Sequence, residues 1–270
     1  KPARLGFGRA RLVWPAGQQL AWKAMMPGIA ATPKAISGGR KELVVAMPVE
    51  ALPEVPRDAP ARFRPVPAIV ASSFTGWDEV ARIMAPLFRT EDTIAEGSDL
   101  AKAVDAIAAA HADPLERTAA ALRMVQNDVR YLLVALGTGN YKPQSPDQTW
   151  RGRYGDCKAK TLLLLAALHR MGIKAEAVLA NSRNGDLVPE MVPAAQAFDH
   201  VFVRAEIGGE SLWLDGTMMG ARLADIRDIP RMGHVLPLRE EGAGLVRLEA
   251  RADAIFAMRM LANEEATIFG

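Results

Sequence analysis

The apolar and polar positions divide the chain into a β-rich first part and a helical middle part. Residues 1 to about 70 lack helical periodicity, and short apolar stretches such as Glu42–Met47 are separated by Pro and Gly. This pattern is typical of short strands and turns, and Gly38-Gly39 would suit a hairpin. Six prolines between positions 48 and 67 predict an extended linker or strap, because proline fixes φ and lacks a backbone donor.

Helical spacing begins after Ser72. We expect a first helix capped by Thr75 or Asp78, and a second helix over the alanine-rich run from about Asp99 to Ala110. A third helix is predicted from Asp113-Pro114, where Asp supplies the cap and Pro occupies the first turn. Its apolar residues recur at steps of three and four, as an amphipathic helix requires.

A fourth helix is expected to begin at Asp156 or Cys157, to carry a wide apolar face, and to end near Arg170. The other apolar segments predict strands, two of them joined by the hairpin turn Gly208-Gly209: Ile173–Ala180, Phe198–Ile207, Ser211–Asp215, Gly244–Arg251 and Ile255–Met260. Helices followed by an antiparallel hairpin indicate an α+β fold rather than alternating βαβ units.

The composition is that of a globular protein, with 50% hydrophobic and 24% charged residues. The net charge of +2 gives no support for nucleic-acid binding, and no apolar run approaches the ~20 residues that span a bilayer. The single cysteine excludes an intramolecular disulfide and a multi-cysteine zinc site. The histidines show no paired metal-ligand spacing, so neither a metal nor a cofactor is expected. The start at Lys1, without a signal-peptide pattern, is typical of a trimmed piece.

The cysteine lies where a thiol can become reactive. Cys157 is at a predicted helix start, where free N–H groups and a partial positive charge favour the thiolate over the thiol. Lys158 and Lys160 act in the same direction, whereas Asp156 opposes it unless its carboxylate caps the helix. The alternative is that Cys157 is simply a small buried apolar residue.

His200 and Asp215 lie on the two strands of the predicted hairpin. If Gly208 and Gly209 form the turn, Phe202 lies opposite Asp215, and His200 shares that face because it is two residues from Phe202. His200 and Asp215 are then diagonal neighbours, roughly 7–8 Å apart at Cα, within reach of one another. The arrangement predicts a base oriented by an acid, although a structural histidine and a plain Asp-Gly turn would also explain these residues.

These residues resemble the transglutaminase-like, papain-like cysteine superfamily, and specifically bacterial domains that follow a β-rich domain of the type called DUF3857. The core resemblance covers about Pro114 to Thr217. The segments that carry it are Ser72–Val80 at the junction, Val129–Tyr131, Asn140–Pro143, Tyr154–Lys158, Met171–Ala175, Phe198–Val201 and Trp213–Thr217. The sequence departs from many relatives at Ala159, where they have Asp, and this change removes no member of the implied triad.

The resemblance implies a triad with Cys157 as nucleophile, His200 as base and Asp215 as orienting acid. The backbone N–H of Cys157 would donate to the oxyanion, with Tyr131 as the second donor and Gln144 as a weaker candidate. Two aromatic residues are candidates for lining the cleft or, alternatively, for the core: Trp150 and Trp213. Basic residues crowd the nucleophile and would either bind an acidic substrate or form an ordinary charged helix start: Arg151, Arg153, Lys158 and Lys160.

We therefore expect a β-rich N-terminal domain with a linker over residues 1–71, a transglutaminase-like domain over 72–220, and a β-rich extension over 221–270. The expected activity is thiolate acyl transfer on a peptide or amide bond of a protein or peptide substrate. The alternatives are a transamidase that cross-links proteins and a binding or assembly module that retains the fold without catalysis. The relatives imply a periplasmic or cell-envelope location, and the sequence carries no indication of oligomeric state.

Overall fold

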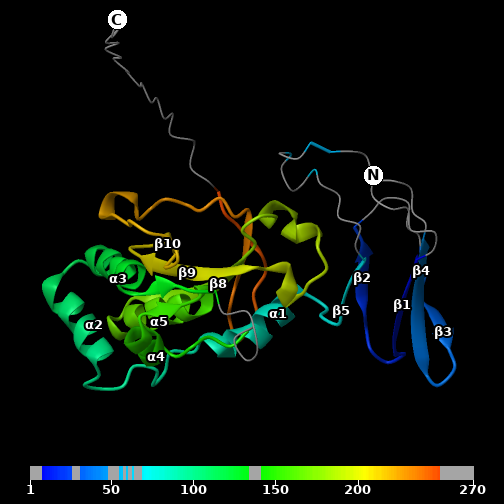
Figure 1. Ribbon diagram of the computed structural model, residues 1–270, viewed down its shortest axis with the longest axis horizontal. Coiled ribbons are helices and arrows are strands. Elements are labelled where there is room, and N and C mark those ends of the chain that lie inside the picture. The colour runs from blue at the N-terminus through cyan, green and yellow to red at the C-terminus, as the bar shows by residue number, and fades with distance from the viewer. Residues whose placement is uncertain are drawn as a thin grey trace, which may run out of the picture.

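The computed structural model describes residues 8–25, 31–47, 55–56, 59, 63, 69–133 and 141–249 (Figure 1). The predicted strand Ile255–Met260 and most of the proline-rich stretch lie outside these residues. The described part consists of small antiparallel sheets at the N-terminal end, followed by a larger unit in which helices pack on a five-stranded sheet.

The first part of the chain is β-rich, as expected. One sheet has the order β1-β4-β3 and a second joins β2 to β5, with all pairs antiparallel. The hairpin predicted at Gly38-Gly39 is confirmed, and both glycines have positive φ, which residues with a Cβ rarely adopt. The strands are β1 (Gly8–Pro15), β2 (Ala21–Ala24), β3 (Lys34–Ile36), β4 (Arg40–Met47) and β5 (Ile69–Ser72).

The predicted helices are present in the larger unit, with one further short helix before the cysteine. They are α1 (Trp77–Met84), α2 (Asp99–Ala110), α3 (Pro114–Asp128), α4 (Pro146–Gly152) and α5 (Cys157–Arg170). Short 3₁₀ helices occupy η2 (Ala85–Phe88), η4 (Gly185–Glu190), η5 (Ala195–Ala197) and η6 (Leu223–Asp225). Among the described residues, no helix combines the length and apolarity that crossing a membrane requires.

The observed N-cap residues agree with the sequence prediction for two of the three helices, α3 and α5. Asp113 caps α3 by accepting from the N–H of Leu115 at 2.9 Å, and Asp156 caps α5. The prediction for α1 was wrong, because its N-cap is Gly76 and no side chain caps it. Thr75 instead donates its backbone N–H and its hydroxyl to the carboxylate of Glu79, so the pair fixes the chain just before the helix.

The main sheet has the order β10-β9-β8-β11-β12, and its pairs are antiparallel. Two strands from the segment predicted as a C-terminal extension therefore belong to the same sheet as the hairpin. The first three strands of this sheet in chain order lie within two residues of the predicted segments, β11 was not predicted, and β12 is a short part of the predicted Gly244–Arg251. The strands are β8 (Lys174–Ala180), β9 (His200–Ile207), β10 (Glu210–Leu214), β11 (His234–Pro237) and β12 (Val246–Arg247). The predicted hairpin register is confirmed, because Ile207 pairs with Glu210.

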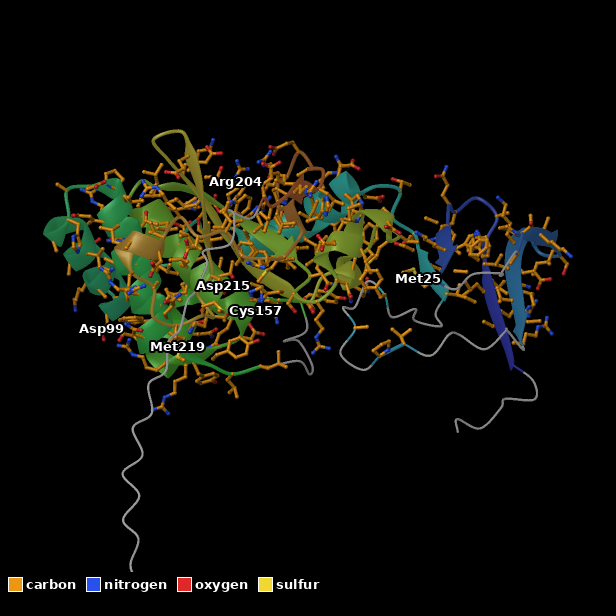
Figure 2. All side chains as sticks on the ribbon, turned by 90° about the horizontal axis from the view of Figure 1, so that it is seen from above. Met25, Asp99, Cys157, Arg204, Asp215 and Met219 are labelled. Atoms are coloured by element: carbon orange, nitrogen blue, oxygen red, sulfur yellow. The ribbon has the colours of Figure 1, made fainter. Side chains whose placement is uncertain are left out.

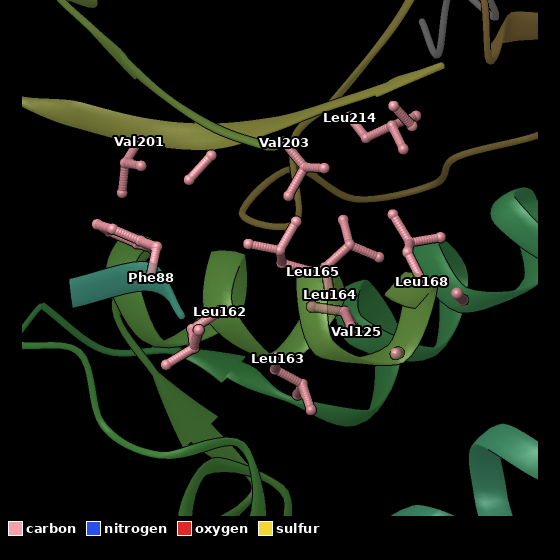
Figure 3. Close-up of a cluster of buried hydrophobic side chains, with 14 of the residues drawn as sticks. Phe88, Val125, Leu162, Leu163, Leu164, Leu165, Leu168, Val201, Val203 and Leu214 are labelled. Atoms are coloured by element: carbon pink, nitrogen blue, oxygen red, sulfur yellow. The ribbon is translucent and has the colours of Figure 1, made fainter. Parts of the chain in front are cut away.

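Helix α5 forms the centre of the core. Its leucines at 163, 164, 165 and 168 are almost completely buried against side chains of β9, β10 and α3 (Figure 3). The helix lies against the sheet in Figure 1, with α2, α3 and α4 beside it. Burying one leucine side chain stabilises the fold by about 1.5–3 kcal/mol. The end of α5 that carries Cys157 is therefore held in a fixed position.

Candidate active site

Cys157 is the first residue of α5, and it is 6% exposed. The N-cap Asp156 accepts from the N–H of Ala159 at 3.1 Å and forms an ion pair with the ammonium group of Lys158. The charge of Asp156 is thus used in capping and pairing. The backbone N–H groups of Cys157 and Lys158 have no acceptor among the described residues, as expected for a helix start.

The segment before Cys157 packs very closely on α5. The short strand β7 (Tyr154–Gly155) pairs in parallel with β6 (Arg130–Tyr131). A Cβ on Gly155 would lie 2.8 Å from the Cβ of Ala159, closer than real side chains approach. Glycine is required at this position because strand and helix are in direct contact. The close packing brings Tyr131 beside the start of α5.

His200 links the cysteine to the acid. Its Nε2 lies 2.8 Å from Oδ2 of Asp215, and His200 and Cys157 line the same pocket. Because Nε2 is used by Asp215, Nδ1 is the nitrogen left for the thiol. Burial lowers the pKa of His200, but the interactions with Asp215 and Cys157 outweigh it and raise the pKa to about 10. The imidazole is therefore held in its protonated form at neutral pH.

Asp215 is fixed by the turn that follows β10. Its Oδ1 accepts from the backbone N–H of Thr217 at 2.8 Å and from the Thr217 hydroxyl at 2.7 Å. The side-chain amide of Gln126 donates to the carbonyl of Asp215 at 2.9 Å. Burial raises the pKa of Asp215, whereas the hydrogen bonds from His200 and Thr217 lower it by more, so the carboxylate stays ionised. Figure 2 shows Cys157 and Asp215 next to one another.

The two predicted oxyanion donors, Tyr131 and Gln144, lie in different positions relative to Cys157. Tyr131 is 49% exposed, and its pKa is raised by partial burial and by the negative charges of Cys157, Asp156 and Asp215. The tyrosine hydroxyl is therefore near these groups and stays protonated. Gln144 precedes α4 and makes no hydrogen bond to Cys157, His200 or Asp215 in the described part of the chain.

A pocket of about 430 Å³ opens beside the cysteine and the histidine. Its walls are mainly apolar and come from α1, η2, the segment after β6, β8 and the segment before β9: Met84, Phe88, Leu133, Leu179 and Phe198. Tyr141, Lys158 and Asp199 lie at its polar side. Asp199 accepts hydrogen bonds from Ser182, which fixes the residue just before His200. The pocket could hold an apolar side chain with its neighbouring carbonyl near Cys157.

The two predicted cleft tryptophans lie in different places. Trp150 lines a larger groove on the other side of Tyr131. Trp213 lines neither the pocket beside Cys157 nor that groove, and its role at the cleft stays a prediction. The ring of Phe202 is next to both His200 and Trp213, with ring centroids 6.1 Å and 6.2 Å away. Trp213 therefore packs on the sheet face, with the guanidinium of Arg204 over its ring.

The basic residues near the nucleophile are not equivalent. Lys158 is paired with Asp156, and Lys160 is 2% exposed with its ammonium group donating to the carbonyl of Val129. Burial lowers the pKa of Lys160, while the nearby charge of Asp215 raises it by less. Lys160 thus ties α5 to the end of α3, just before Tyr131. Lys160 is therefore unavailable to bind a substrate from solution, whereas Lys158 lines the pocket beside Cys157 while it is paired with Asp156.

The sequence pattern did not predict two residues that position Asp215 and His200. Gln126 lies on the buried face of α3 and joins Asp215 to the N–H of Ala221. Asn181 is buried and donates to the carbonyl of Ala197, which orders the chain before His200. A polar residue on an apolar helix face was a usable signal for Gln126. Asn181 follows a strand and precedes a polar loop, so its pattern carried no such signal.

No three side chains of His, Cys, Asp and Glu gather as metal ligands would within the described ranges. The groups at the site that can react or donate hydrogen bonds are the thiol, the imidazole, the carboxylate and the backbone N–H groups around them.

No model of a known family and no curated protein matches this sequence. Among solved structures, the chain is similar to a candidate protease from Parabacteroides distasonis, with a TM-score of 0.64 and 18% identity. The match covers 90% of this chain and 45% of that one, so the chain spans less than half the length of that protein. At this identity the likeness shows a shared fold alone.

Two weaker likenesses have TM-scores of 0.36 and 12% identity, too low to support an argument. A candidate cysteine protease from Cytophaga hutchinsonii matches over 92% of this chain and 82% of its own, and a TGase over 69% and 43%. The predicted α+β fold class is confirmed by the architecture itself, in which the helix that carries Cys157 packs on an antiparallel sheet.

Proposed function

We propose that this protein is a cysteine hydrolase that cleaves a peptide or amide bond by acyl transfer through Cys157. The observation that carries the proposal is that His200, hydrogen-bonded to Asp215, lines the same pocket as Cys157. A thiol, an imidazole and a carboxylate in this order are the parts that nucleophilic catalysis requires. A purely structural thiol needs neither of the other two groups.

The proposed reaction begins with a thiolate on Cys157 and a proton on His200. The sulfur attacks the carbonyl carbon, and the oxyanion that forms accepts hydrogen bonds from the N–H of Cys157 and the hydroxyl of Tyr131. The carbon–nitrogen bond breaks as His200 donates its proton to the leaving amine, and a thioester remains on the sulfur. Asp215 stabilises the imidazolium and holds Nδ1 toward the thiol.

Water completes the proposed cycle. His200 takes a proton from the water as its oxygen attacks the thioester, the carbon–sulfur bond breaks, and a carboxylic acid leaves with the thiolate restored. If a primary amine replaced water at this step, the same residues would form a new amide, and the protein would be a transamidase. The acceptor that reacts thus separates the two activities.

The proposal is tested by the reactivity of the single thiol. Iodoacetamide labelling is followed by mass spectrometry from pH 5 to 9 in the wild type, in His200→Ala, and in His111→Ala as a histidine control far from the site. We expect rapid wild-type labelling well below pH 8.5, the range of a free thiol, and a shift toward pH 8.5 only in His200→Ala. A thiol that labels only on unfolding, unaffected by His200, would overturn the proposal in favour of a binding module.

A second measurement identifies the acceptor. A peptide library is incubated with the wild type and with Cys157→Ala, with and without a labelled primary amine. Cleavage that depends on Cys157 and continues without the amine supports the hydrolase. Incorporation of the amine in large excess over cleavage would instead assign a transamidase.

We also propose that the β-rich unit within residues 1–71 is a domain of the DUF3857 type and that the protein works in the periplasm or cell envelope. The antiparallel sheet β1-β4-β3 and the junction sequence Ser72–Val80 support the first part. Fractionation of the native host with an antibody to this protein tests the second part, and recovery in the cytoplasmic fraction would contradict it.

A further inference from the structure

A second cavity, of about 1160 Å³, is lined by Tyr131 and Leu132. It lies between α2, α3 and the paired strands β6 and β7, with Trp150 and Tyr154 in its wall, and we call it the arginine groove. Tyr131 pairs with Gly155, two residues before Cys157, so the groove begins beside the start of α5. A chain that passes Cys157 can therefore continue into the groove.

The groove is lined by three arginines and one acidic residue, Asp128. Arg123 and Arg130 make no ion pair or hydrogen bond with any side chain in the described part of the chain, and Arg153 has its guanidinium 3.7 Å from the centre of the Trp150 ring. Some arginines outside the groove are neutralised by carboxylates, as Arg170 is by Glu96 and Asp105. The groove differs because it holds three arginines together. Like charges repel, so a cluster without partners is a site for an anionic ligand.

The backbone fixes two of the arginines relative to one another. Arg153 is the C-cap that ends α4, with φ of 56° and its N–H donating to the carbonyl of Thr149. Its own carbonyl accepts from the N–H of Arg130 at 2.8 Å. Arg130 and Arg153 are therefore held side by side.

We propose that the arginine groove binds an acidic segment of the peptide substrate, next to the bond that Cys157 attacks. Guanidinium groups form paired, charge-assisted hydrogen bonds with carboxylates, and the aromatic walls supply contact area for the peptide between them. This assignment rests on the proposed function for its link to cleavage. The binding step itself needs only the groove, because none of the three arginines takes part in the proposed chemistry.

The test measures peptide binding without turnover. The full chain carrying Cys157→Ala is titrated, with fluorescence anisotropy as readout, against a fluorescein-labelled decapeptide of alternating Ala and Glu, and against the same peptide with Gln for Glu. We expect the Glu peptide to bind at least tenfold more tightly at low salt and to lose this advantage as salt screens the charges. Equal binding of the two peptides would overturn the proposal.

Arginine variants locate the binding. Arg123→Gln and Arg130→Gln together should weaken Glu-peptide binding by at least tenfold, with an unchanged melting temperature. The matched control is Arg247→Gln, because Arg247 is an exposed arginine of β12, outside the groove. It should change binding less than twofold, and an equal loss in this control would overturn the proposal. An oligothymidine of the same charge that binds more tightly than the Glu peptide would overturn the assignment to an acidic peptide.

Failure of the two proposals is distinguishable. Glu-peptide binding that depends on Arg123 and Arg130 supports the groove even if Cys157 proves unreactive. A reactive Cys157 without preference for the Glu peptide supports the hydrolase and overturns the groove.

Discussion

The imidazole of His200 lies 2.8 Å from the carboxylate of Asp215, although one residue begins β9 and the other follows the end of β10. The hairpin brings them together because its two-residue turn sets the register of the strands. His200 also lines the same pocket as Cys157, which starts a helix more than forty residues earlier in the sequence. The hairpin thus places a carboxylate-bound imidazole near the start of α5.

Replacing the carboxylate of Asp215 should disturb the orientation of the His200 ring without unfolding the protein. Asp215→Asn keeps the size of the side chain but removes the negative charge that stabilises the imidazolium. We expect the fold to persist and any Cys157-dependent cleavage to fall by about 10²–10⁴-fold, as loss of tautomer and charge control does in triads. The measurements are the cleavage rate and the circular dichroism spectrum.

Asp225→Asn is a matched control for that change. Asp225 pairs with Arg222 at the exposed surface, and exposed pairs contribute little. Its cleavage rate should stay within twofold of the wild type. Wild-type cleavage in Asp215→Asn would remove Asp215 from the mechanism.

The raised pKa of His200 predicts how stability changes with pH. Because the folded state raises this pKa from 6.5 to about 10, the protonated histidine stabilises the fold fully below pH 6.5, and this contribution is lost as pH rises through about 10. The free energy of unfolding of the wild type, minus that of His200→Gln, should therefore fall between pH 6.5 and 10.

Urea denaturation at several pH values measures this difference. The slope is at most about 1.4 kcal/mol per pH unit, the value for one proton. A difference that stays constant, or that grows with pH, would show that His200 is neutral in the folded protein.

The support of Asp215 by Gln126 gives a prediction for stability. Gln126→Ala would leave the carbonyl of Asp215 and the N–H of Ala221 without their partner in a poorly hydrated region. An unsatisfied buried polar group costs about 1–3 kcal/mol, so the free energy of unfolding should fall by at least that much. Gln148→Ala, at an exposed glutamine of α4, is the control and should change it by less than about 0.5 kcal/mol.

The cleavage rate in Gln126→Ala adds a second readout. If Gln126 only fills space, cleavage per folded molecule will stay at the wild-type value. A fall in that rate would show that the position of Asp215 depends on α3.

The parts of the site that local sequence determines were predictable. Gly208 and Gly209 define the turn of the hairpin, so the relative positions of His200 and Asp215 followed from counting along two strands. The cap at Asp156 followed from its residue type at the start of an apolar helix. In both cases the information lies within a few residues, where spacing decides the geometry.

Contacts between distant segments were not predictable in the same way. Gln126 reaches Asp215 across 89 positions, and no local pattern encodes that distance. The sequence left Trp213 as either a cleft or a core residue, and the structure places its ring beside Phe202. The pairing of Lys158 and the burial of Lys160 likewise depend on tertiary packing, which removes Lys160 from solvent.

The close contact between β7 and α5 gives the last prediction. In Gly155→Ala the new Cβ would lie 2.8 Å from the Cβ of Ala159 and 3.2 Å from Cγ2 of Thr149, and neither neighbour is a flexible side-chain end. The strand must therefore move away from the helix. Overpacking of this kind costs about 1–3 kcal/mol, and the shift should also slow iodoacetamide labelling of Cys157 at pH 6.

A second change can relieve the overlap. Adding Ala159→Gly removes the closer of the two contacts, so the double variant should recover part of the labelling rate even though glycine inside a helix costs roughly 0.5–1 kcal/mol. Gly17→Ala is the control, because Gly17 has no neighbour within 4 Å of a new Cβ and should leave labelling unchanged. Recovery of labelling without recovery of stability would show that the spacing between β7 and α5 sets the reactivity of the thiol. If the double variant labels as slowly as Gly155→Ala, that spacing does not control the site.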